Sequence, residues 1–240
     1  MLLSSCRPSA PTLRYRCALL DHLLAILLLF VVPVRALWRS RPGRTASGTK
    51  ITRYITTIGM VAGLLALLTT SWLMTGRSAQ ALGLNTPTST PSLIGLGVAI
   101  ATFIALFLSK GKKPKPSQRE EIEAVRRDLF PETPNEMKLF LLLSLAVGSG
   151  WEILYRGFLL YYLPSKIGLS GAIIIAALAY GAAHGFKTPK KFVGSIVSAL
   201  AFTIAYVATS NLWWLMLIHI GVMLFGAIVS TAISGDLEAS

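Results

Sequence analysis

The chain has 240 residues, of which 53% are hydrophobic and 14% are charged, and its formal net charge is +13 at pH 7. This composition excludes an ordinary soluble domain and is typical of a polytopic membrane protein. In a soluble protein the positive charge would suggest a nucleic-acid partner. Here the basic residues lie mostly between apolar runs. They therefore indicate membrane topology and contacts with anionic membrane lipid, and we expect no nucleic-acid partner.

Seven apolar runs follow one another along the chain, and each is too long and too continuous for a strand of a membrane β-barrel. Because backbone groups in lipid must be hydrogen-bonded within the protein, these runs predict helices. The predicted fold is all-α, a polytopic membrane helix bundle of about seven transmembrane helices. The expected spans cover residues 18–38, 54–74, 93–108, 139–163, 169–183, 192–208 and 212–233.

The longest polar segment separates the third span from the fourth. Residues 110–116 have the composition of an exposed linker, and residues 117–130 have the pattern of a short amphipathic helix. That helix either lies on the membrane surface or serves as a solvated connector. The loops after the first, third and fifth spans carry 16 Lys and Arg residues, against 5 in the N-terminus and the other loops. This bias predicts an N-terminus outside the cell and a C-terminus in the cytoplasm.

One ionisable pair lies deep in an apolar run. Glu152 and Arg156 occur within the fourth expected span, which is otherwise almost uncharged. Charges at bilayer depth cost several kcal/mol, roughly 3 or more for a single residue, unless they pair or serve a site. The two residues are four apart, so a helix places them on one face with the acid before the base, which is the favourable order. They are either a structural ion pair or part of an intramembrane site.

Two histidines extend this inventory. His184 stands at the end of the fifth expected span, and His219 lies in the first half of the seventh. A polar side chain inside an apolar span usually has a partner, and His is the side chain most suited to proton transfer near neutral pH. Sparse ionisable groups on three separate spans predict one shared site within the membrane. The candidate catalytic residues are Glu152, Arg156, His184 and His219.

Three short strings around these residues resemble a known family. They are Glu-x-x-x-Arg-Gly-Phe-Leu from Glu152, Tyr-x-x-x-His from Tyr180, and the segment that begins at His219. In order and approximate spacing they are similar to the motifs of the CPBP family, the CAAX-protease and bacteriocin-processing intramembrane endopeptidases also called Abi. The resemblance covers roughly residues 138–232.

The resemblance implies a division of the chain and an activity. Residues 1–137 would form N-terminal transmembrane helices with basic loops, residues 138–232 a CAAX-protease-like core, and residues 233–240 a short C-terminal tail. The protein would be an integral membrane protein, with a bacterial cytoplasmic (inner) membrane as the expected location. It would hydrolyse a peptide bond of a peptide or membrane-protein substrate at the membrane.

The sequence departs from the family pattern at two polar positions. Trp151 stands where the family has the first Glu of its Glu-Glu-x-x-x-Arg motif, and Met223 stands for a final Asn or Asp. In the family the first Glu is thought to activate water. On a helix, position 152 points about 100° away from position 151, so Glu152 is not expected simply to fill the missing role.

Two arrangements of the site remain open. In one, Glu152, His184 and His219 are the three protein ligands of zinc or another divalent metal, as in other hydrolytic sites with two imidazoles and a carboxylate, and no carboxylate is left as a base. In the other, Glu152 activates water while the histidines bind metal or the oxyanion. Pairing with Arg156 would make the Glu152 carboxylate poorly basic.

Three functions are therefore compared. The first is a divergent CAAX-type intramembrane metalloendopeptidase. The second is a catalytically inactive family member that acts as a membrane binding protein or a bacteriocin-immunity protein. The third is a small transporter or channel accessory, which the absence of repeats and of further intramembrane acids disfavours.

Overall fold

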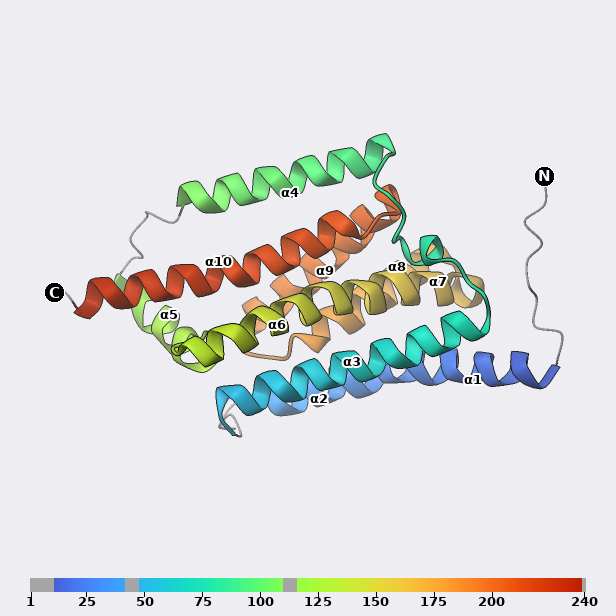
Figure 1. Ribbon diagram of the computed structural model, residues 1–240, viewed down its shortest axis with the longest axis horizontal. Coiled ribbons are helices and arrows are strands. Elements are labelled where there is room, and N and C mark those ends of the chain that lie inside the picture. The colour runs from blue at the N-terminus through green and yellow to red at the C-terminus, as the bar shows by residue number, and fades with distance from the viewer. Residues whose placement is uncertain (1–10, 42–47, 110–115, 239–240) are drawn as a thin grey trace.

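The computed structural model describes residues 11–41, 48–109 and 116–238, and within these ranges all regular structure is helical (Figure 1). Seven of the helices are long and apolar enough to cross a membrane, which confirms the predicted all-α bundle. These seven candidate spans are Ala18–Arg39, Lys50–Met74, Thr90–Leu108, Pro134–Tyr162, Pro164–Ala183, Pro189–Thr209 and Trp213–Ser230.

Thirteen helical segments build the described part of the chain. In order they are α1 (Pro11–Ile26), the π-helical η1 (Leu27–Val31), α2 (Val32–Arg39), α3 (Lys50–Met74), the 3-10 turn η2 (Ala79–Leu82), α4 (Thr90–Ser109), α5 (Pro116–Leu129), α6 (Pro134–Trp151), the π-helical η3 (Glu152–Phe158), α7 (Leu159–Tyr162), α8 (Pro164–Ala183), α9 (Pro189–Thr209) and α10 (Trp213–Glu238). The last helix runs to Glu238, so the segment expected as a C-terminal tail continues α10.

Several spans begin three to five residues earlier than the apolar runs predict, because polar caps start the helices. The Thr49 side chain accepts a hydrogen bond from the backbone N–H of Thr52 before α3. Thr133 and Glu136 form a capping box at the start of α6, and Thr188 caps α9 in the same way as Thr49. The capping residues are hydrophilic, so a search for apolar runs alone places these helix starts too late.

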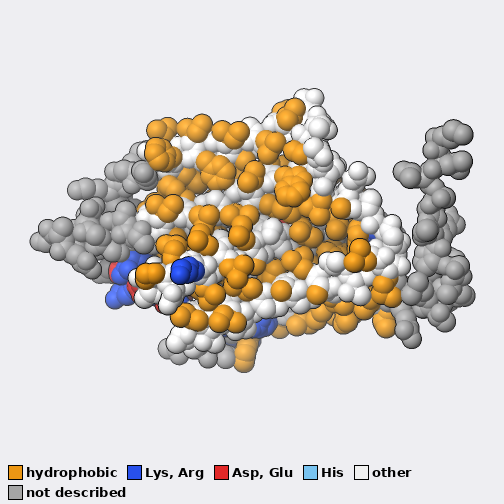
Figure 2. Space-filling model, in the orientation of Figure 1, with side chains coloured by type: hydrophobic (Ala, Val, Ile, Leu, Met, Phe, Trp, Pro, Cys, Tyr) orange, Lys and Arg blue, Asp and Glu red, His pale blue; other side chains and the backbone are white. Residues whose placement is uncertain are grey.

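The middle of the bundle is the continuous rod of α6, η3 and α7 (Figure 1). Helix α6 packs against α3 on one side and α10 on the other, and α4 lies on the far side of α10. Helix α8 packs against α9 and α2. The visible face in Figure 2 is largely apolar, and most charged side chains on it lie toward its left end. A broad apolar face with charge at one end suits a bundle surrounded by lipid.

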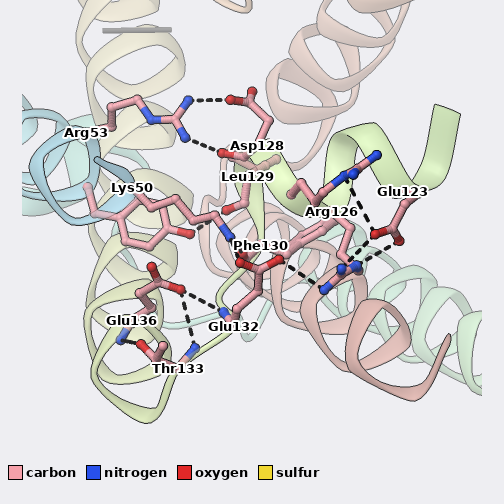
Figure 3. Close-up of polar contacts among 12 residues, drawn as sticks. Lys50, Arg53, Glu123, Arg126, Asp128, Leu129, Phe130, Glu132, Thr133 and Glu136 are labelled. Atoms are coloured by element: carbon pink, nitrogen blue, oxygen red, sulfur yellow. Dashed lines mark hydrogen bonds and ion pairs between the residues drawn. The ribbon is translucent and has the colours of Figure 1, made fainter. Parts of the chain in front are cut away.

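The charged end of the bundle is held by ion pairs from α3 to the end of α5 and to the segment that links α5 to α6 (Figure 3). Arg53 Nη1 donates to Asp128 Oδ1 at 2.5 Å, and its Nη2 donates to the backbone carbonyl of Asp128. Lys50 Nζ lies 2.8 Å from Glu132 Oε2. These contacts place the start of α3 and the start of α6 at the same end of the bundle.

Helix α5 confirms the predicted short helix after the linker. Arg126 donates to both carboxylate oxygens of Glu123 at 2.8 and 2.7 Å, and its Nη1 lies 3.1 Å from Glu132 Oε1. The hydrogen bonds from Arg126 hold the pKa of Glu123 below its ordinary value. Through Glu132 the helix shares its polar contacts with Lys50 of α3. A position on the membrane surface stays a prediction.

Two glycines set the helix spacing around the middle of the bundle. A Cβ atom at Gly148 of α6 would lie 2.9 Å from the backbone nitrogen of Ile220 in α10. A Cβ atom at Gly181 of α8 would lie 2.8 Å from the Cα atom of Ile196 in α9. These helices therefore pack backbone to backbone, as small residues permit in membranes. Gly194 of α9, by contrast, has no neighbouring atom within 4 Å of its Cβ position.

This spacing gives a matched pair of variants. Gly148→Ala should lower the thermal stability of the detergent-solubilised protein, because the added methyl group meets Ile220 and overpacking of this kind costs about 1–3 kcal/mol. Gly194→Ala should leave stability unchanged or raise it, because the position is open and Ala favours a helix by about 1 kcal/mol. Thermal unfolding followed by circular dichroism measures both. Equal midpoints for Gly148→Ala and Gly194→Ala would contradict the close packing of α6 on α10.

Candidate functional site

The site begins where α6 passes into the π-helical turn η3. Glu152 is the first residue of η3, and Arg156 is its fifth. Wide π turns inside α-helices occur frequently at functional sites, and they change which side chains share a face after the insertion. Gly157 in the same turn faces the η2 segment, since a Cβ there would lie 2.9 Å from the backbone oxygen of Leu82. The turn is therefore packed closely against η2.

The Glu152 carboxylate is 3% exposed and accepts from three donors. Its Oε2 accepts from Nη1 of Arg156. Its Oε1 accepts from the hydroxyl of Tyr180 at 3.1 Å and lies 3.0 Å from Nδ1 of His219. The donors come from η3, α8 and α10, so one carboxylate connects three segments of the bundle. A buried carboxylate of this kind is tolerated because it is paired and hydrogen-bonded.

Arg156 fills the space beside this carboxylate and is 2% exposed. The centre of its guanidinium lies 4.6 Å from the ring centroid of Tyr180 and 5.9 Å from that of Phe202 in α9. These aromatic faces are favourable surroundings for a cation. The Nε atom of Arg156 is buried and has no hydrogen-bond partner. Arg156 thus keeps one donor that pairing with Glu152 does not use.

Each of the two site histidines is oriented by a hydrogen bond that its Nδ1 atom donates. Nδ1 of His184 lies 2.9 Å from the backbone carbonyl oxygen of Tyr180. A carbonyl can only accept, so this Nδ1 carries the hydrogen. Nδ1 of His219 faces the Glu152 carboxylate. This carboxylate is ionised in its pair with Arg156 and can only accept, so Nδ1 of His219 carries a hydrogen as well. In the neutral form both rings then leave Nε2 without a hydrogen, free to accept a proton or to bind a ligand.

A cavity of about 380 Å³ lies beside these groups. All four residues predicted from the sequence line it, namely Glu152, Arg156, His184 and His219. The rest of the lining comes from α9 and α10 and is mostly apolar, with Ala199, Phe202, Leu215, Ile218, Val222 and Met223 beside Ser195 and Ser198. The cavity therefore pairs an ionisable wall with an apolar one.

The four residues are not equally close. Glu152 contacts both Arg156 and His219, whereas His184 contacts Tyr180, with ring centroids 4.9 Å apart. Tyr180 itself was missed as a site residue, because it stands where the family motif has Phe. Its hydroxyl is 3.1 Å from Glu152 and 3.2 Å from His219. The added hydroxyl at this motif position was the sequence signal that could have identified it.

Trp151 and Met223, the two departures from the family pattern, lie differently with respect to the cavity. Met223 lines the cavity among its apolar side chains. Trp151 is not one of the residues that line it, and the Trp151 ring packs on Tyr155 with centroids 5.7 Å apart. The expected difference in direction between positions 151 and 152 is therefore present, but it is Glu152 that faces the histidines.

The residues of the predicted metal site are engaged with protein partners. Among the residues that the structure describes, no three His, Cys, Asp or Glu side chains gather closely enough to hold a metal ion. Glu152 already accepts from Arg156, Tyr180 and His219, so it orients an imidazole instead of completing a ligand set with both histidines. This arrangement does not fit a zinc site with Glu152, His184 and His219 as its three ligands, and metal binding stays a prediction.

Comparison with known proteins agrees with the motifs. The family model described as type II CAAX prenyl endopeptidase Rce1-like matches residues 133–225, from the cap of α6 into α10, and the matched region contains all four candidate residues. No curated protein and no solved structure matches the chain. The match over residues 133–225 supports membership of the CPBP/CAAX-protease family for this part of the chain.

Proposed function

We propose that this protein is an intramembrane endopeptidase that hydrolyses a peptide bond in the cavity bordered by η3, α8, α9 and α10. The observation that carries the proposal is the contact between Glu152 Oε1 and His219 Nδ1, at 3.0 Å. A carboxylate that holds one imidazole nitrogen leaves the other available as a base, which is the carboxylate–histidine arrangement used in many hydrolases. The family match over the same residues supports this chemistry.

His219 would be the general base in this mechanism. Its Nε2 takes a proton from a water molecule in the cavity, and Glu152 stabilises the imidazolium that forms. The water oxygen attacks the carbonyl carbon of the substrate, and His219 then returns the proton to the leaving amine. His184 presents a second Nε2 acceptor, which would orient the attacking water.

The developing negative charge needs a donor. Arg156 lines the cavity, and its Nε has no hydrogen-bond partner. A guanidinium group in a buried site stabilises an oxyanion strongly, because little water competes with it. In this proposal Arg156 holds Glu152 with Nη1, and the positive charge of its guanidinium stabilises the oxyanion.

The apolar wall of the cavity indicates the substrate. A peptide whose scissile bond is next to an apolar group would place that group against Phe202, Leu215 and Val222. The matched family model is named for prenyl endopeptidases. We therefore propose a peptide with a prenylated cysteine near its C-terminus as the first substrate class to test, presented from the lipid phase.

A second function is favoured by the replaced motif residues. Trp151 removes the first Glu of the family motif, and Met223 replaces a polar residue with an apolar one in the cavity wall. A family member altered in this way could bind a peptide in the cavity and protect against a bacteriocin without cleaving it. The same cavity and the same ionisable wall would serve this binding role.

The first test concerns the base. His219→Ala and Glu152→Gln should each reduce cleavage of a prenylated peptide by the reconstituted protein by about 10²–10⁴-fold, the usual contribution of a general base. His22→Ala is the matched control, since this histidine packs on Tyr162 away from the cavity, and it should retain full activity. Cleavage is followed by mass spectrometry of the products. Undiminished cleavage by His219→Ala would refute the assignment of His219 as the base. A wild-type protein that binds the peptide without cleaving it would favour the binding function.

The second test separates the two functions at position 151. Because Trp151 does not line the cavity, Trp151→Glu should give no gain in cleavage over the wild type. Trp151→Phe should keep wild-type activity, since an aromatic ring can still pack on Tyr155. Both variants are assayed with the same reconstituted peptide reaction. If Trp151→Glu switches on cleavage in a protein that is otherwise inert, the chain is an inactive family member that lacks its first acid.

A further inference from the structure

A second hollow opens at the charged end of the bundle. It has a volume of about 740 Å³ and lies between the end of α2, the start of α3, the end of α5 and the segment after α8. Five of its lining residues are basic, and one is acidic, Asp128. The basic residues are Arg35, Arg39, Arg41, Arg53 and Lys187. We propose that this hollow binds the phosphate of an anionic phospholipid headgroup.

The positive charge of the hollow is largely uncompensated. The charge of Asp128 is already paired with Arg53, which donates to both the carboxylate and the backbone carbonyl of Asp128. Arg35 donates to the sulfur of Met60 at 2.8 Å, a weak neutral acceptor that leaves its charge in place. Within the part of the chain that the structure describes, no ion pair to a carboxylate is found for the other three basic residues, Arg39, Arg41 and Lys187.

Arg53, which lines the hollow, has one donor without a partner. Nε of Arg53 is buried and has no hydrogen-bond partner, although both of its terminal nitrogens are engaged by Asp128. A buried donor left unpaired costs about 1–3 kcal/mol, and a phosphate oxygen is a strong acceptor for a guanidinium N–H. Because Nε is enclosed by protein atoms, Arg53 contributes its positive charge to an anion in this hollow.

The backbone around the hollow is fixed. Ser40, after the end of α2, accepts a hydrogen bond from the backbone N–H of Phe186 at 2.5 Å and donates to the carbonyl of Ala36 at 2.8 Å. Gly185 has φ 77°, and a Cβ there would lie 2.8 Å from the hydroxyl of Ser40. Contact this close, together with the positive φ, requires glycine. The segment that carries Lys187 is thereby held against the segment that carries Arg39 and Arg41.

The depth of the hollow favours a lipid over a free anion. Its walls are the ends of two candidate spans, since the first span ends at Arg39 and the second starts at Lys50. Trp38 lines it, 49% exposed, and Trp is enriched where membranes meet water. Val34 and Ile55, one turn deeper, are 61% and 55% exposed and would contact acyl chains. Basic hollows between spans at this depth bind anionic headgroups.

The experiment measures lipid retention by the full chain. Protein solubilised from phosphatidylglycerol–phosphatidylcholine membranes is examined by native mass spectrometry, and binding is titrated with phosphatidylglycerol in a zwitterionic detergent. Combined Arg39→Gln, Arg41→Gln and Lys187→Gln should weaken phosphatidylglycerol binding by at least tenfold, since each basic side chain at an anionic surface contributes about fivefold. Phosphatidylcholine should bind neither protein.

The matched control removes the same charge at the same end of the bundle. Arg127→Gln, Lys138→Gln and Lys190→Gln lie outside the hollow and should leave phosphatidylglycerol binding within about twofold of the wild type. Equal weakening in both triple variants, with unchanged unfolding midpoints, would overturn the site in favour of general surface charge. Inorganic phosphate or glycerol phosphate that displaces the lipid at equal concentration would overturn the lipid as ligand. Because binding and not cleavage is read, failure here leaves the proposed hydrolysis untouched.

Discussion

The Glu152 carboxylate is the point at which η3, α8 and α10 are held together. A charged group in an apolar bundle costs several kcal/mol, roughly 3 or more, unless its charge and hydrogen bonds are met inside the protein. Here Arg156 supplies the charge, and Tyr180 and His219 supply further donors. Removal of the carboxylate would leave the buried guanidinium of Arg156 without its counter-ion. The same contacts that make Glu152 tolerable therefore also orient the histidine that could act as a base.

This carboxylate can reach its partners only because the helices approach closely. Gly148 brings α10 against α6 one turn before Glu152, and Ile220, which it contacts, directly follows His219. Gly181 brings α9 against α8 directly after Tyr180. The small residues thus lie next to the functional ones in sequence. Packing and chemistry are specified by adjacent positions, so substitutions at either kind of position alter the same cavity.

Features that depend on residues close together in the chain could be predicted from the sequence. The seven spans follow from the lengths of the apolar runs, and the contact of Glu152 with Arg156 follows from their spacing of four. The π-helical turn η3 has no such signal, because nothing in the residues of that turn separates it from an ordinary helix. The three-ligand zinc arrangement treated Glu152 as free for a metal. In the structure this carboxylate contacts Tyr180 and His219, which come from helices distant in the chain, and metal binding stays a prediction.

The basic hollow shows the same limit more clearly, since its residues come from segments up to about 150 positions apart, from Arg35 to Lys187. The charge bias of the loops placed positive residues at one end of the bundle, but only the fold arranges them around a common space. His184 lines both the hollow and the cavity beside Glu152, and it is exposed. A headgroup phosphate bound among these cations would lie next to the imidazole proposed to orient the attacking water. Lipid binding at the charged end and peptide hydrolysis within the bundle would then act on the same side chain.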